Sequence, residues 1–142
     1  MFRFAGLAFS IITILVAQER PAQAKQEMLW AAISVQPSVF VEGHTEALQL
    51  YFYVVNDGSS PINPKVESSH LLINGVEPKD WSNVISDGLR SPLFYALPPG
   101  QLLEFTYLLE QYFRKPGIYT VGWSGENFKA LDISIRVLPA HR

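Results

Sequence analysis

Histidine and cysteine are the side chains that most often hold a metal ion, so their number and spacing are considered first. The chain of 142 residues has no Cys and three His, namely His44, His70 and His141. No two of them have the i, i+2 or i, i+4 spacing that places two imidazoles on one metal ion. Only two Met are present, which weakens thioether ligation of copper. The sequence therefore predicts no metal ion and no other cofactor.

A nucleophilic serine is the second kind of chemistry that a short motif can indicate. Segment 122–126, GWSGE, begins like the G-x-S-x-G elbow of serine hydrolases but ends in Glu126 where the motif has glycine. It also lies at the end of a predicted strand, not between a strand and a helix. The acidic residues are spread singly, and no D-x-[DN]-x-[DN]-G calcium loop occurs. We therefore expect that the protein is not an enzyme.

Aromatic side chains remain as candidates for binding, since the chain has nine Phe, six Tyr and three Trp. Tyr51 and Tyr53 share one face of a predicted strand, and Tyr combines rigid apolar area with a polar tip. With Trp81 they form the candidate interaction surface, for a partner protein or a sugar. The alternative, which we favour for the two Tyr, is cross-strand packing within the sheet.

Strands are the elements that must position these residues, because apolar side chains recur at every second position. The alternation is clear over 48–55, 103–109 and 131–137. It indicates sheets with one packed face and one wet face, as in an antiparallel sandwich. The side chains predicted to point inward include Phe52, Phe105, Tyr107, Trp123, Leu131, Ile133, Ile135 and Val137.

Two breaks in the pattern predict further features. Pro37 separates the apolar pieces 33–36 and 39–42, which we interpret as one bent first strand at an edge or a switch between sheets. Asp80 is a candidate N-cap for a single helical turn over 81–86.

The dipeptide Asn74-Gly75 predicts a hairpin turn of type I′ between 70–73 and 76–78. Counting the other turn signals, the chain has six to eight short strands and no long helical pattern. It shows no internal repeat and no low-complexity tract. The prediction is therefore one all-β domain, an antiparallel sandwich of about seven strands over 25–142.

The first 24 residues are predicted to be a secretory signal peptide. Arg3 precedes an apolar run over 5–17, and an A-x-A cleavage site follows at 22–24. The run is shorter than the roughly 20 residues that cross a bilayer, although an uncleaved anchor is the alternative. Cleavage after Ala24 leaves 142 − 24 = 118 residues. We expect a periplasmic or secreted protein that is not attached to a membrane after cleavage.

Charge excludes one large class of partner. The chain has 11 Lys and Arg against 13 Asp and Glu, for a net charge of −2. Proteins that neutralise several phosphates need a surplus of basic residues on one face. We therefore expect no binding to nucleic acid.

Segment 116–123, PGIYTVGW, resembles the penultimate strand of immunoglobulin-like domains. The upstream segment 97–100, LPPG, followed by an alternating strand, resembles bacterial members of that superfamily. In those domains a G-x-Y element enters the strand, and the Tyr hydroxyl folds back as a tyrosine corner. The resemblance covers about 31–139 and implies an immunoglobulin-like β-sandwich. Val121 stands where antibody domains carry their second Cys, so the resemblance implies no immune role.

The resemblance implies a binding or structural module. We expect its partner to be another protein. Small immunoglobulin-like protease inhibitors are a looser similarity, without the N-P-T-T-G loop of the chagasin family. An inhibitor would act through end loops such as 56–69 or 80–92. Carbohydrate binding is the further alternative, and it would require Tyr51, Tyr53, Trp81 or Trp30 to be exposed together.

Overall fold

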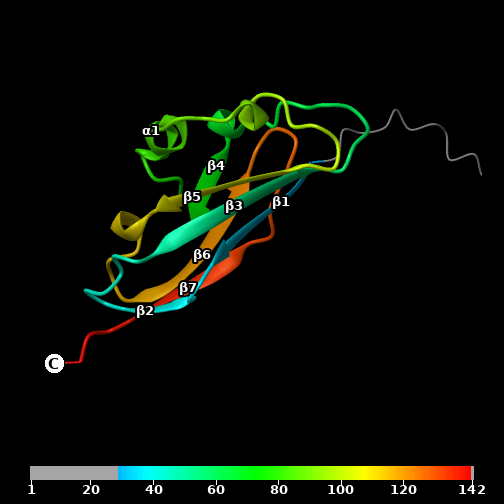
Figure 1. The fold of residues 1–142 in the computed structure, drawn as a ribbon. Coiled ribbons are helices and arrows are strands. Elements are labelled where there is room, and N and C mark those ends of the chain that lie inside the picture. Colours follow the sequence, from blue (N-terminus) through cyan, green and yellow to red (C-terminus); the bar gives the residue numbers. More distant parts are fainter. Residues whose placement is uncertain (1–28, 142) are drawn as a thin grey trace, which may run out of the picture.

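The computed structural model describes residues 29–141 of the chain (Figure 1). The predicted signal peptide, residues 1–24, and its cleavage site lie outside the described residues. Within the described part, seven strands form two facing sheets, and one short α-helix lies beside them. No helix in this part is long and apolar enough to cross a membrane.

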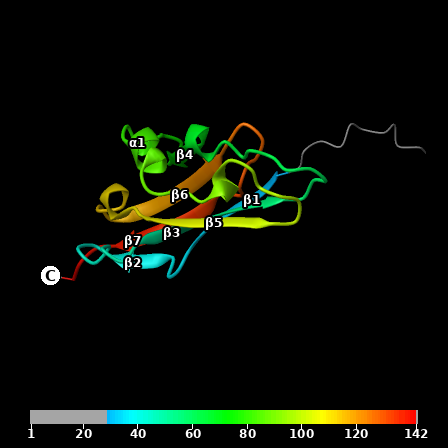
Figure 2. The ribbon, with the colours of Figure 1, turned by 45° about the horizontal axis from the view of Figure 1, so that its top comes forward.

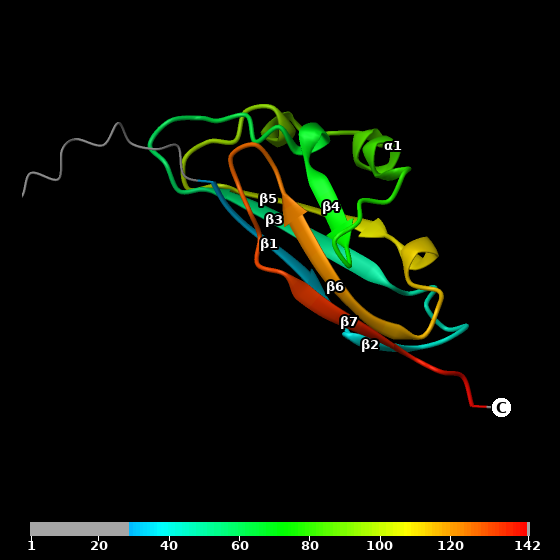
Figure 3. The same cartoon turned by 180° about the vertical axis from the view of Figure 1, so that it is seen from behind.

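The two sheets differ in size and in their pairing. The first has the order β1-β3-β5, with both pairs antiparallel. Its strands are β1 (Leu29–Val35), β3 (Gln49–Asn56) and β5 (Leu102–Leu108). The second has the order β2-β7-β6-β4, in which β2 runs parallel to β7 and the other pairs are antiparallel. Figure 3 shows its strands from behind, β2 (Val39–Val41), β7 (Ile133–Leu138), β6 (Gly117–Ser124) and β4 (His70–Ile73).

This strand order is that of an immunoglobulin-like sandwich. In that fold strands A, B and E lie in one sheet, and strands C, F and G form the other. Here β1, β3 and β5 pair as A, B and E do, while β4, β6 and β7 pair as C, F and G do. The predicted all-β sandwich of about seven strands is confirmed.

The first strand is divided between the two sheets. β1 ends at Val35 in the three-stranded sheet, and β2 begins at Val39 in the four-stranded sheet, with Pro37 between them. Proline has no N–H to donate to a ladder, so it suits a place where pairing stops. The predicted switch between sheets is confirmed.

Alternating side chains of both sheets build the core. Every second residue of β3 is buried, and Phe52 lies at the centre. Its ring stacks on Phe105 at a centroid distance of 5.0 Å and meets the edge of Trp123 at 5.0 Å. Tyr107 lies 6.1 Å from it, also edge to face. The predicted inward phase of these four aromatic residues is confirmed.

The predicted inward position of Leu131 is wrong, because the chain changes phase before β7. Ala130 is buried and its N–H donates to Trp123 O, but Leu131 is 87% exposed. Asp132 is exposed as well, and alternation resumes only at Ile133, where β7 begins. Leu131 and Asp132, two consecutive exposed residues, therefore lie between the buried Ala130 and the start of β7.

The predicted hairpin turn and the predicted short helix between β4 and β5 are both present. Asn74 and Gly75 have φ of 50° and 78°, the positive values that a type I′ turn requires, although pairing after the turn is limited to one bridge. Helix α1 (Trp81–Ser86) forms where expected. Asp80 occupies the predicted N-cap position, and its backbone oxygen accepts from Val84 N–H, but its side chain makes no capping bond. Its carboxylate instead accepts a hydrogen bond from Tyr112.

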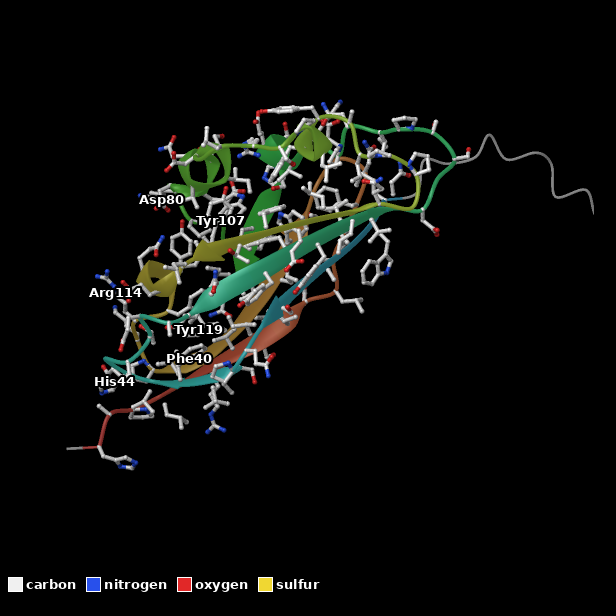
Figure 4. The ribbon with its side chains drawn as sticks, viewed as in Figure 1. Phe40, His44, Asp80, Tyr107, Arg114 and Tyr119 are labelled. Carbon is white, nitrogen blue, oxygen red and sulfur yellow. The ribbon has the colours of Figure 1, made fainter. Side chains whose placement is uncertain are left out.

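The tyrosine corner that the resemblance implies is present. The Tyr119 hydroxyl donates to the backbone oxygen of Lys115 at 2.6 Å, four residues upstream. The Tyr119 ring also packs edge to face on Phe113 at 5.1 Å. Figure 4 shows Tyr119 toward the end of the sandwich where Arg114 lies. The corner thus ties the entry of β6 to the segment before it.

Candidate functional site

The outward face of the three-stranded sheet carries the two Tyr of the candidate surface. Odd-numbered residues of β3 and even-numbered residues of β1 and β5 point away from the core. The register sets their side chains in rows across the three strands: Ser34-Tyr51-Thr106, Ala32-Tyr53-Glu104 and Trp30-Val55-Leu102. We call this surface the outer face.

Tyr51 and Tyr53 are half-buried on the outer face. The Tyr51 hydroxyl donates to Gln49 Oε1 at 3.4 Å, and the Tyr53 hydroxyl accepts from Ser34 Oγ at 3.4 Å. Both phenols therefore contact strand neighbours. The contact of Tyr53 crosses from β3 to β1, as favoured from the sequence, whereas that of Tyr51 stays within β3.

Trp81 does not belong to any surface, so its place in the candidate surface is wrong. It is 0% exposed, and its Nε1–H donates to the backbone oxygen of Ser69 at 3.0 Å. Its ring lies 5.9 Å from Phe52 and 6.3 Å from Tyr107. Helix α1 turns Trp81 and Ile85, one turn apart, into the opening between the two sheets. A helix of six residues is too short for its sequence to show which side of it is buried.

The end row of the outer face is apolar and exposed. Trp30 is 60% exposed and Leu102 is 47% exposed, with the half-buried Val55 between them. Glu104 is the one charged residue among the outward positions of these three strands. From the sequence, Trp30 was a candidate only for the sugar alternative. Its place between the apolar residues Leu29 and Ala31 would have predicted that it points outward. The row itself depends on the register, which a single sequence does not show.

A polar group lies on the second sheet. The β4–β6 register places Ser124 opposite His70, and His70 Nδ1 lies 2.9 Å from Glu77 Oε1. This is the order of a Ser-His-acid triad, but among residues 29–141 no hydrogen bond joins Ser124 to His70. His70 is also exposed. A nucleophile is activated by hydrogen-bond contact with its base, and Ser124 lacks that contact with His70 among residues 29–141.

Arg90 is a buried cation in the loop after α1. Its side chain is 7% exposed, and its Nε lies 3.4 Å from Glu67 Oε1. The guanidinium carbon lies 4.8 Å from the centre of the Phe94 ring. Among residues 29–141, no group accepts a hydrogen bond from Nη1 or Nη2. Arg90 thus holds its loop against the 3₁₀ turn η1 (Val66–Ser68) and against η2 (Pro92–Phe94).

The segments considered for an inhibitor do not converge on one end. The turn 57–61 lies at one end of the sandwich, and α1 lies near the other (Figure 1). Asn56 anchors the turn, because its Nδ2 donates to Ser60 O and to Leu97 O, both at 2.8 Å. The segments 56–69 and 80–92 meet between these ends, through the contact of Glu67 with Arg90.

Metal ligands do not gather in the part of the chain that the structure describes. Within residues 29–141, no three His, Asp or Glu side chains lie close enough together to hold one metal ion. His44 and His141 make no side-chain hydrogen bond within these residues.

The fold of the chain is similar to that of a solved protein domain. No protein-family model matches the chain, and no curated protein matches it. The chain is similar to the CARDB domain of the PF1109 protein from Pyrococcus furiosus, whose crystal structure is a complex with di-metal ions. The two share 16% identity over 82% of this chain and 97% of that chain, with a TM-score of 0.49. At these values, the site and the function rest on the chain's own residues.

Proposed function

We propose that the chain is an exported immunoglobulin-like binding module that contacts another protein through the outer face of β1, β3 and β5. The observation that carries this proposal is the exposed apolar row of Trp30, Val55 and Leu102. Sheet faces that meet only water normally alternate apolar-in and polar-out. A row of large apolar side chains on the wet side is therefore typical of an interaction surface.

The composition of the outer face fits a protein partner. Trp is enriched among the residues that dominate binding energy at protein interfaces, and charged residues are depleted from interface centres. The outer face offers Trp30 with one charged side chain, Glu104, which lies in the next row and on the opposite strand, β5. Tyr53 lies between Ala32 and Glu104 in that row, and its hydroxyl adds a polar group to the outer face. A partner with a complementary apolar patch and few charges fits this chemistry.

Export is supported by the sequence of residues 1–24, with its apolar run and its A-x-A site. The mature chain begins at Lys25 under this proposal. N-terminal sequencing of the extracytoplasmic protein tests it, and a product that keeps Met1 would contradict it. Protein interaction is preferred over carbohydrate binding because Trp81 is buried and Tyr51 and Tyr53 are half-buried, so the four aromatic residues are not exposed together.

The test of the binding surface is a matched pair of substitutions. Trp30→Ser removes the largest side chain of the exposed row, while Leu131→Ser removes an exposed apolar side chain outside the outer face. Surface substitutions usually change the free energy of unfolding by less than about 0.5 kcal/mol, so both variants are expected to fold.

Quantitative affinity capture from extracytoplasmic extract compares the two variants with the original chain. We expect specifically captured proteins to be lost with Trp30→Ser and retained with Leu131→Ser. Equal capture by a folded Trp30→Ser variant would place the binding surface elsewhere.

A further inference from the structure

β5 is an edge strand, and its backbone groups alternate between two sides. Leu109 N–H donates to Leu48 O at 3.1 Å, and Gln101 O accepts from Asn56 N–H at 3.2 Å. The odd-numbered positions of this strand therefore face β3. The even-numbered positions turn their N–H and C=O groups away from β3, and these are Leu102, Glu104, Thr106 and Leu108.

No backbone or side-chain group among residues 29–141 pairs with those outward backbone groups. Figure 2 shows β5 running along the edge of its sheet, with β3 as its neighbour. Native edge strands are usually protected by Pro, by Lys or by a covering segment. The sequence of β5, LLEFTYL, contains neither Pro nor Lys. The loop 87–91 faces this edge but makes no backbone hydrogen bond to it, so the outward groups of β5 are free to pair with another strand.

A groove lies directly beside β5. This groove of about 400 Å³ is lined by Glu104 and Thr106 from the outer face and by Phe105 and Tyr107 from the inner face. Because side chains of both faces line the same hollow, the groove follows the edge of the strand and not one of its faces. The loop 87–91 forms the opposite wall.

We propose that β5 pairs antiparallel with β5 of a second copy of the chain, around a two-fold axis that passes at Phe105. In this register Leu102 lies opposite Leu108 of the second copy, and Glu104 lies opposite Thr106 of the second copy. In each strand, the four residues whose N–H and C=O groups point away from β3 then lie opposite the same kind of residue in the second copy. An antiparallel ladder requires this arrangement. The two three-stranded sheets become one continuous sheet of six strands.

Side-chain chemistry selects this register over its neighbours. A shift by one pair in one direction places Glu104 opposite Glu104 of the second copy, and like charges directly opposite each other are destabilising. A shift in the other direction leaves Leu102 without a partner and sets Glu104 opposite Leu108. Only the register centred on Phe105 pairs leucine with leucine at both ends and keeps the carboxylates out of directly opposed positions.

The proposed contact also covers apolar surface that the single chain exposes. Leu102 is 47% and Leu108 is 61% exposed, and each would lie against the other in the pair. Phe105 is half-buried and borders the groove, so its copy would cover it on the inner face. A contact of one strand is small, so we expect a weak, concentration-dependent dimer. The association does not require the proposed partner protein, which would contact the row of Trp30, Val55 and Leu102 on the outer face. Leu102 would border both contacts.

Charge substitutions test the dimer and its register together. Thr106→Lys places a lysine opposite Glu104 of the second copy twice per dimer, while Thr106→Glu places two carboxylates opposite each other twice. Sedimentation equilibrium from about 1 μM to 1 mM measures each dimer dissociation constant. We expect roughly 2- to 30-fold tighter association for Thr106→Lys and weakening of similar size for Thr106→Glu.

The double variant Glu104→Lys/Thr106→Glu restores opposite charges and is expected to dimerise more tightly than Thr106→Glu alone. Every variant carries the same N-terminal residues, so differences between them report on β5. Monomers at all concentrations for both the original chain and Thr106→Lys would overturn the proposal. A dimer equally stable in all four proteins would overturn it as well, because its contact would lie elsewhere.

Hydrogen exchange gives a second measurement that does not depend on charge. The amides of Glu104 and Thr106 face the edge, whereas those of Phe105 and Tyr107 face β3. We expect exchange at the first two to slow as protein concentration rises and exchange at the other two to stay slow throughout. Thr106→Pro, which removes one outward N–H, is expected to abolish the dimer, with Thr106→Val as its matched control. Edge amides whose exchange is independent of concentration would contradict the pairing.

Discussion

The Tyr112 hydroxyl donates a hydrogen bond to Asp80 Oδ1 at 2.7 Å. The bond joins the 3₁₀ turn after β5, η3 (Glu110–Tyr112), to the residue that precedes α1, 32 positions earlier in the chain. It explains why the Asp80 side chain makes no capping bond to α1, because its carboxylate accepts the hydrogen bond from Tyr112 instead. Burial, followed by this hydrogen bond, raises the pKa of the Tyr112 phenol above its ordinary value.

The raised pKa predicts how stability changes in alkali. A phenol whose folded pKa lies above its unfolded value of about 10 stabilises the fold fully below that pH. This contribution is lost as the pH rises through the folded pKa. Tyr112→Phe is expected to lower the free energy of unfolding by about 0.5–1.5 kcal/mol near pH 7 and by less at roughly pH 11.

Urea unfolding at both pH values measures this difference. Burial also raises the pKa of Tyr107, whose hydroxyl reaches the backbone oxygens of Ile85 at 3.5 Å and Asp87 at 3.3 Å beside α1 (Figure 4). The double variant Tyr107→Phe/Tyr112→Phe is therefore expected to show the weakest alkaline loss. The same deficit for Tyr112→Phe at both pH values would show that folding does not raise the pKa of the Tyr112 phenol.

The two buried Trp should respond differently to the same substitution. Trp81 Nε1–H has an acceptor, Ser69 O, whereas Trp123 Nε1–H has no hydrogen-bond partner among residues 29–141. Replacement by Phe removes a hydrogen bond and strands a carbonyl only at Trp81, which costs about 1–3 kcal/mol beyond the loss of packing. We expect Trp81→Phe to be more destabilising than Trp123→Phe in chemical denaturation. The opposite order would contradict the assigned hydrogen bond.

Trp123→Ala measures the core itself. Trp123 is 1% exposed and its ring contacts Phe128 at 4.5 Å as well as Phe52. Removing a buried aromatic side chain leaves a cavity and costs about 3–5 kcal/mol. Such a loss is a large part of the stability of a small domain. A change below about 1 kcal/mol in urea unfolding would mean that the ring is not in the core.

Tyr119→Phe isolates the tyrosine corner. The substitution keeps the ring packed on Phe113 and removes one neutral hydrogen bond, to Lys115 O. The expected loss in the free energy of unfolding is about 0.5–1.5 kcal/mol. Thermal unfolding of this variant that matches the original chain would show that the corner bond is replaced by water at no cost.

Two glycines three positions apart, Gly122 and Gly125, test local crowding. A Cβ at Gly125 would overlap the ring of Phe128, which is buried, so Gly125→Ala is expected to cost about 1–3 kcal/mol. A Cβ at Gly122 would meet Asp132 Oδ1 at 2.7 Å, but that side chain is exposed and can turn aside. Gly122→Ala is the matched control and should cost less than about 1 kcal/mol. Equal losses in denaturant unfolding would contradict the packing of Phe128 on Gly125.

Local patterns in the sequence were sufficient for the strands and their turns. Alternation with period two marks which side of a strand is apolar, and the inward phase of Phe52, Phe105 and Trp123 follows from it. Asn74-Gly75 and Pro37 also act locally, through the backbone angles they allow and the N–H that proline lacks. The architecture could be predicted because sandwich folds are built from such short-range signals.

Contacts between distant segments required the tertiary structure. The burial of Trp81 depends on where α1 docks, because its helix is too short to carry a pattern of its own. The engagement of Asp80 by Tyr112 and the approach of Glu67 to Arg90 each join residues more than twenty positions apart.

The candidate surfaces belong to this second kind of information. Trp30, Val55 and Leu102 form a row only because the register of three strands aligns them. The open edge of β5 exists because no other strand pairs beyond it among residues 29–141. Side-chain type and local spacing determine which face of a strand is apolar, but sheet order and register decide which residues become neighbours, since those depend on the simultaneous packing of the whole chain.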